Sequence, residues 1–160
     1  MSRIKTTLIV LPFVLAGCVS EPASRPEPRT PAVDLDAVLP PQSLLREDTV
    51  AALAHDRNES RLAYVGVWAT HGDKCAMMDQ TAFEGFAVIT PDSIRQSTGT
   101  CSFEPGAPGE TNVSFNATCE SGRKRTNRLI SVQMLNAETL ALGTMPDQPA
   151  VPMVRCRLQE

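Results

Sequence analysis

The sequence lacks several features that would narrow its function at once. It has no apolar run near the roughly 20 residues that a helix needs to cross a bilayer, so we expect no transmembrane helix. Aromatic residues make up only 4% of the chain, which argues against a large stacking surface. A net charge of -3 at pH 7 and a pI near 5.4 give no reason to expect a nucleic-acid partner.

Motifs for metal binding and catalysis are also missing. The chain has two histidines, and no pair of its cysteines has the two-residue spacing of common structural zinc sites, so we expect no metal and no cofactor. His71 lies near Asp73, but no Gly-x-Ser-x-Gly motif accompanies them, and a solvated loop histidine accounts for the pair. The sequence therefore predicts that the protein is not an enzyme.

A short targeting signal is present at the N-terminus. Arg3 and Lys5 give it a positive start, and Leu8–Leu15 form an apolar run too short to span a bilayer. The run ends in Leu15-Ala16-Gly17-Cys18, where small residues lead into one cysteine at the position of a secretory cleavage site. This arrangement resembles the signal of bacterial lipoproteins.

That resemblance implies removal of residues 1–17, a thioether-linked diacylglycerol on Cys18 and an acylated new N-terminus. Each buried methylene contributes about 0.8 kcal/mol, so two chains already give stable anchoring. In such lipoproteins an Asp after the cysteine favours retention in the inner membrane, and Val19 therefore indicates the outer membrane. We expect a lipid-anchored domain that faces the periplasm, with exposure at the cell surface left open.

Composition divides the rest of the chain into three parts. Residues 18–42 combine the lipidated cysteine with a proline-rich tether, because proline fixes φ and removes backbone donors. Residues 43–58 contain one helix, which Ser43 begins and Arg57 ends. Residues 59–160 have a period-two pattern interrupted by turn residues, which is typical of antiparallel strands.

The fold class that this pattern predicts is mainly β, with one short N-terminal helix. Short connections and one apolar face per strand favour a small antiparallel meander closed, or nearly closed, into a barrel of about seven strands. The expected strands are 61–70, 83–90, 93–104 (broken at Gly99), 111–119, 126–135, 139–142 and 151–158.

Four cysteines remain after Cys18, and export would place them in an oxidising compartment, so we expect two disulfides. The midpoint between Cys101 and Cys119 falls at a Pro/Gly-rich turn, and a hairpin folded there sets the two cysteines opposite each other. This leaves Cys75 to pair with Cys156. The spacing does not exclude the alternative pairing, 75–101 with 119–156.

Gly66-Val67-Trp68 lies in the first expected strand. This Gly-x-Trp resembles the start of lipocalin-type barrels and of small periplasmic proteinase-inhibitor barrels of the Inh type. In such barrels the tryptophan plugs one end and often stacks on an arginine of the last strand. The resemblance implies that Arg155 or Arg157 has this role, although a core tryptophan of any β-protein explains the motif equally well.

A looser likeness connects the domain with small, uncharacterised, cysteine-bearing proteobacterial lipoproteins that carry no known activity. The shared features are a Gly-x-Trp-Ala, a Cys-x-Phe strand, an Ala-Thr-Cys strand and two further cysteines. In this chain they are residues 66–69, 101–103 and 117–119, with Cys75 and Cys156.

Basic residues cluster at one expected hairpin tip: Arg123, Lys124, Arg125 and Arg128. They suit a contact with lipid phosphates, lipopolysaccharide or peptidoglycan carboxylates, and a solvated turn explains them equally simply. Our main functional prediction is a non-enzymatic envelope lipoprotein whose barrel binds a macromolecular partner, as a hydrolase inhibitor or in support of the envelope. The alternative is a carrier that holds a small apolar ligand inside the barrel.

Overall fold

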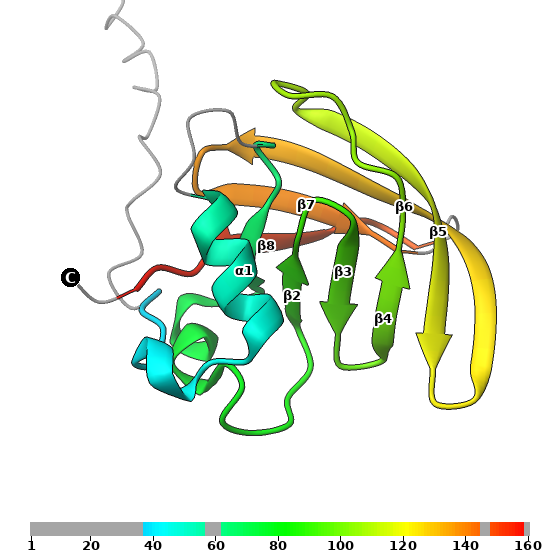
Figure 1. Ribbon diagram of the computed structural model, residues 1–160. Coiled ribbons are helices and arrows are strands. Elements are labelled where there is room, and N and C mark those ends of the chain that lie inside the picture. Colours follow the sequence, from blue (N-terminus) through cyan, green and yellow to red (C-terminus); the bar gives the residue numbers. More distant parts are fainter. Residues whose placement is uncertain (1–36, 57–61, 145–147, 159–160) are drawn as a thin grey trace, which may run out of the picture. The chain divides into compact units, whose positions relative to one another are not determined.

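The computed structural model describes residues 37–56, 62–144 and 148–158. It contains a closed barrel of eight antiparallel strands, each paired with its neighbour in the sequence, with the last strand paired back to the first (Figure 1). The strands are β1 (Gly66–Ala69), β2 (Phe86–Ile89), β3 (Ser93–Gln96), β4 (Gly99–Ser102), β5 (Asn112–Ser121), β6 (Lys124–Asn136), β7 (Thr139–Gly143) and β8 (Val151–Arg155). The prediction of a mainly β, closed barrel is confirmed.

The barrel has one strand more than expected because residues 93–104 form two strands, β3 and β4. The chain turns at residues 97–98, and Gly99 then begins β4 with φ of 142°. A Cβ at Gly99 would lie 2.0 Å from the backbone oxygen of Glu120. Only glycine allows β4 to approach β5 this closely. The glycine at which the strand was expected to break therefore starts a second strand.

Side chains from all around the barrel fill its interior. The largest of them are Trp68 and Tyr64, which are 0% and 1% exposed. Aliphatic residues from β2, β3, β6, β7 and β8 pack around them, and Phe115 lies between Tyr64 and Phe103 in an edge-on and a stacked contact. The clean alternation of β5, with Val113, Phe115, Ala117 and Cys119 inward, follows from this one-sided burial.

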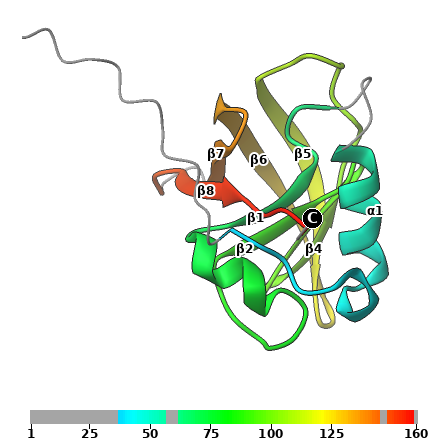
Figure 2. The ribbon, with the colours of Figure 1, turned by 90° about the vertical axis from the view of Figure 1, so that its left-hand side faces the viewer.

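A second apolar cluster covers the outside of β1 and β2. It consists of residues from helix α1 (Glu47–Asp56), the 3-10 helix η2 (Gly72–Met77) and residues 37–39, packed against Val67, Ala69, Phe86 and Val88. Because both faces of these two strands are buried, their sequences are continuously apolar rather than alternating. Figure 2 shows α1 lying along this side of the barrel.

The end of the expected tether packs on the domain. Ala37 and Leu39 are 5% and 3% exposed, although residues 18–42 were expected to form a tether that does not contribute to the core. Leu39 donates its backbone N–H to the oxygen of Arg157 at 2.6 Å, and the N–H of Arg157 donates to the oxygen of Ala37 at 2.8 Å. These bonds add a parallel bridge beside the end of β8, so the packed domain begins by residue 37 at the latest.

Helical structure after this bridge is shorter than the single helix expected over residues 43–58. A 3-10 turn, η1 (Gln42–Leu44), precedes α1, which begins at Glu47 rather than at Ser43. The expected helix end, Arg57, lies outside the described residues. Helix η2 had no counterpart in the sequence analysis. Within the described part of the chain, no helix is long and apolar enough to cross a membrane.

Two disulfides connect distant parts of the domain, in the pairing that the hairpin argument favoured. Cys101 and Cys119 are opposite each other on β4 and β5, with Cα atoms 3.8 Å apart. Cys75, on η2, is bonded to Cys156, which directly follows β8 and lies 81 residues along the chain. The second bond therefore holds η2 and the end of β8 against the outside of β1.

Truncation from the N-terminus separates the tether from the packed segment. A chain that begins at Ala37 should unfold at the same urea concentration as one that begins at Val19, whereas a chain that begins at Gln42 should be less stable. The last truncation removes the buried Leu39 side chain, whose loss alone should cost about 2–4 kcal/mol. Equal stability of all three chains, measured by urea denaturation, would contradict this account of residues 37–41.

Candidate functional site

The interior of the barrel closes at one end through Trp68 and Arg155, which face each other on β1 and β8. The guanidinium carbon of Arg155 lies 4.1 Å from the centre of the Trp68 ring system, a cation–π contact. The indole N–H of Trp68 donates to the backbone oxygen of Tyr64 at 3.0 Å. The ring of Trp68 is therefore buried, and its N–H is hydrogen-bonded inside the protein.

Arg155 is buried at this end of the barrel, where a carboxylate compensates its charge. It forms an ion pair with Asp56 at the end of α1. It also donates to three backbone oxygens: to Ala137 at 2.9 Å, to Ala63 at 2.8 Å and to Val65 at 3.2 Å. An arginine that is this well bonded fixes four chain segments to one another, and it has the geometry of a structural plug rather than of a ligand-binding group.

Gly66 leaves room for this arginine. Its φ is 151°, and a Cβ built on it would lie 2.9 Å from Nη1 of Arg155. The Gly-x-Trp motif thus has a physical explanation in this chain, since the glycine admits the guanidinium that covers the tryptophan. Arg157, the other plug candidate, is exposed and forms an ion pair with Glu138 instead.

Tyr64 closes the interior near the loop that follows β4. Its hydroxyl oxygen accepts a hydrogen bond from the backbone N–H of Gly106 at 3.0 Å. Burial raises the pKa of this phenol; the Gly106 hydrogen bond lowers it and the nearby Glu110 carboxylate raises it. The tyrosine thus stays neutral and acts as a packing residue.

A polar cluster on the outside of the barrel fastens α1 to β3. Arg95, with an exposed side-chain fraction of 12%, pairs with Asp48 and with Asp79, whose side chain is 1% exposed. Asp79 also accepts hydrogen bonds from the hydroxyl of Thr49 at 2.6 Å and from the backbone N–H of Arg46 at 2.9 Å. Asp79 adopts φ of 61°, a conformation rare for residues other than glycine, which these contacts stabilise.

Two open grooves flank this cluster. One, of about 680 Å³, runs between α1 and the β2–β3 turn and includes His55 and Asp92. The other, of about 690 Å³, lies beside β2 and β3 and includes Phe83 and Glu84. Both are surface features with mixed charge, and the arginine between them is engaged with carboxylates. The sequence analysis did not identify this cluster, because its members are far apart in the chain and have no motif.

The catalytic and metal-binding possibilities find no added support in the geometry. His71 is exposed and precedes η2, and Asp73 is exposed on its first turn. Within residues 37–56, 62–144 and 148–158, no group of three histidine, cysteine, aspartate or glutamate side chains is arranged to hold a metal ion. Cys18 lies outside the described residues.

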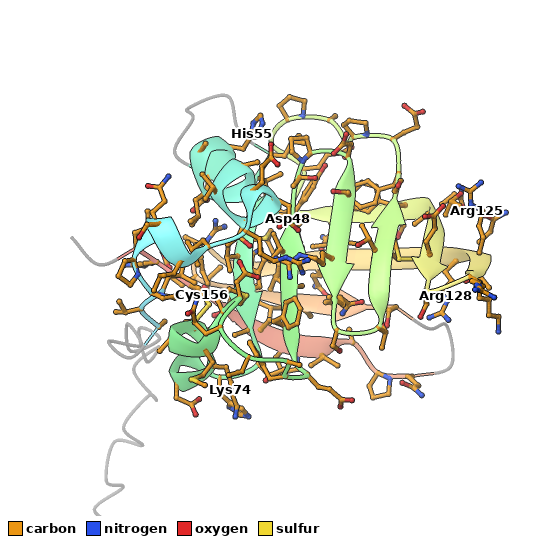
Figure 3. All side chains as sticks on the ribbon, turned by 60° about the horizontal axis from the view of Figure 1, so that its bottom comes forward. Asp48, His55, Lys74, Arg125, Arg128 and Cys156 are labelled. Atoms are coloured by element: carbon orange, nitrogen blue, oxygen red, sulfur yellow. A yellow bond between two sulfur atoms is a disulfide. The ribbon has the colours of Figure 1, made fainter. Side chains whose placement is uncertain are left out.

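The basic cluster occupies the tip of the hairpin formed by β5 and β6. Figure 3 shows Arg125 and Arg128 at the end of the barrel remote from Cys156. Arg125 pairs with Glu120 across the two strands, and both side chains are largely exposed. Arg123, Lys124 and Arg128 are exposed, and among the described residues no carboxylate pairs with them. Three of the four positive side chains at this tip therefore have no carboxylate partner among the residues that the structure describes.

No family model, no curated protein and no solved structure matches this chain.

Replacement of Arg155 tests the plug. Arg155→Lys keeps the positive charge but cannot reproduce the planar donors that reach Ala137, Ala63 and Val65, so it should destabilise the domain by about 2–4 kcal/mol. Arg157→Lys, on the exposed neighbour, should change stability by less than about 0.5 kcal/mol. Urea denaturation measures both. Similar effects of the two changes would show that the hydrogen bonds of Arg155 stabilise the domain no more than a surface ion pair does.

Proposed function

We propose that the protein is a non-enzymatic, lipid-anchored lipoprotein of the bacterial outer membrane, whose closed barrel presents its outer surface to a macromolecular partner. The observation that carries the proposal is the filled interior. Sites for small ligands are concave spaces of about 300–1,000 Å³ lined by apolar groups. In this barrel the interior is occupied by buried side chains of the protein itself, of which Trp68 and Tyr64 are the largest.

This filling disfavours the alternative function, an apolar-ligand carrier. For a ligand to fit inside the barrel, its largest interior residues, Trp68 and Tyr64, would have to be smaller or move aside. Trp68 is held by its indole hydrogen bond and by Arg155, and Tyr64 by Phe115 and Gly106. Opening the interior would break these contacts, and a bound ligand would have to compensate for their loss.

Rigidity supports binding through the outer surface. Two disulfides and the Arg95 cluster hold the helix and the strands in one arrangement. A surface that is already ordered loses little conformational entropy on binding, which favours tight association with a protein. A rigid exposed hairpin suits an inhibitor of an envelope hydrolase, and it suits a structural role at the envelope equally.

The anchor part of the proposal rests on the resemblance of residues 1–18 to lipoprotein signals. In that interpretation residues 19–36 separate the lipid from the domain. Their proline-rich sequence predicts an extended spacer, and at about 3.1 Å per residue such a spacer would reach roughly 55 Å. A partner can then be reached without strain on the anchor.

Substitution of the lipidated residue tests the anchor. Cys18→Ser removes the thiol that would carry diacylglycerol, so the precursor should stay uncleaved by the lipoprotein signal peptidase and should not incorporate radioactive palmitate. The unsubstituted chain is the positive control in the same cells. Palmitate incorporation into the Cys18→Ser chain would overturn the lipoprotein interpretation.

Binding measurements separate the partner from the carrier function. The chain from Val19 onward should show no saturable binding of a fluorescent fatty-acid analogue, and it should bind saturably to detergent-solubilised envelopes. Trp68→Ala serves as the control, because the space it opens should admit apolar probes if the domain stays folded. Stoichiometric, micromolar binding of the analogue by the unsubstituted chain would support the carrier and overturn the proposal.

A further inference from the structure

Strand β6 is longer than the strand that follows it, and half of one edge has no strand beside it. On one side, residues 124–133 of β6 pair with β5. On the other side, β7 pairs only with residues from Ser131 onward. Within the described part of the chain, no strand pairs with this edge of residues 124–130, which we call the free edge. Six of these seven residues are exposed or half-buried, and Ile130 is buried.

The register shows which backbone groups the free edge offers. The N–H of Met134 donates to the oxygen of Thr111, on the β5 side. In an antiparallel pair alternate residues direct their N–H and C=O groups to the same neighbour, so even-numbered residues of β6 face β5. The odd-numbered Arg125, Asn127 and Leu129 therefore direct theirs outward. An added strand would find donors and acceptors there at the normal spacing.

Side chains around the free edge separate into two faces. Lys124 and Arg128 extend on the face that bears Ala117 and Cys119, because each is opposite an inward residue or the strand end of β5. Asn127 and Leu129 extend on the other face. There, with Asn116 and Thr118, they line a groove of about 520 Å³ that Ala117 and Arg128 also border, and Leu129 is 53% exposed. One face thus carries Lys124 and Arg128, and the other carries Asn127, Leu129 and the ion pair between Arg125 and Glu120.

Charge decides which kind of strand fits. Among the described residues, three of the four cations at this tip have no carboxylate partner, whereas the chain as a whole carries a net charge of -3. Positive side chains on an exposed edge prevent pairing between two identical edges, because like charges would meet. A second copy of this chain is therefore disfavoured, and an extended segment with negative charges is favoured.

We propose that the free edge of β6 binds an extended acidic segment of a partner protein as an additional strand. Carboxylates at every second position of that segment face Lys124 and Arg128. The residues between them are small or apolar and lie over Asn127 and Leu129. This inference rests on the proposed function, since it names the part of the outer surface and the chemistry of the partner.

A synthetic peptide provides the probe. A nine-residue peptide that alternates Asp with Val or Thr, labelled with a fluorophore, is titrated with the full chain in detergent, and binding is followed by anisotropy. A second peptide has Lys in place of each Asp. A third keeps every Asp but is N-methylated at alternate residues on its pairing edge, which removes its backbone donors. We expect the first peptide to bind, and we expect the other two to bind at least tenfold more weakly.

Two protein variants separate the backbone from the side chains. Asn127→Pro removes an N–H that points away from β5, so the β5–β6 ladder keeps its bonds while the free edge loses a donor. Asn127→Thr loses the amide side chain but keeps the N–H, and it is the matched control. We expect Kd to rise at least tenfold for Asn127→Pro and less than threefold for Asn127→Thr. Arg128→Gln should also raise Kd at least tenfold.

The outcomes distinguish the proposals. Unchanged binding by Asn127→Pro and of the N-methylated peptide, with loss in Arg128→Gln, would mean charge attraction alone and would overturn strand addition. Binding of anionic phospholipid vesicles but not of the acidic peptide would assign the tip to lipid phosphates and overturn the inference.

If Asn127→Pro and Arg128→Gln still bind solubilised envelopes as the unsubstituted chain does, the inference fails while the proposed function stands. If the Asn127→Pro variant does not fold, the N-methylated peptide still gives the backbone test.

Discussion

Closure of the barrel depends on the contact between its first and last strands. β1 and β8 share only the pairs Trp68–Arg155 and Ala69–Val154, so few backbone bonds join the ends of the sheet. The Arg155 guanidinium compensates for this by connecting the tryptophan, the end of α1 and three backbone oxygens. On the outer side, the Cys75–Cys156 bond holds the same junction. Packing of the remaining interior therefore depends on the junction between β1 and β8.

Much of the domain could be predicted from the sequence, because its strands alternate in burial and are separated by turn residues. The alternation in β5, the turn residues between strands and the even number of cysteines indicated an antiparallel barrel with two disulfides, and the hairpin midpoint favoured the pairing of Cys101 with Cys119. Arg155 was one of two candidates for the plug, and the structure distinguishes them, because Arg157 points into solvent and pairs with Glu138. Alternation along β8 could not decide this, since both arginines fall on the same face.

Other features depend on contacts that no local pattern encodes. Ala37 and Leu39 resemble the rest of the proline-rich segment, and only the outside of β1 and β2 makes them core residues. Asp79 belongs to a turn with no motif, yet it fastens α1 to β3 through Arg95 and Thr49. Similarly, the free edge of β6 follows from the difference in length between β6 and β7, which the strand pattern alone did not reveal.

The route by which the chain enters the domain has a mechanical consequence. If Cys18 is fixed in a membrane and a partner holds the β5–β6 hairpin, any separation of the two pulls on residues 37–39. Their backbone bonds to Arg157 form a parallel bridge, and Arg157 is the neighbour of Cys156. Tension that reaches this point loads the hydrogen bonds between residues 37–39 and Arg157, and the adjacent Cys75–Cys156 bond ties this end of the chain covalently to η2. The segment after β8 can then be pulled away from β1 only together with η2.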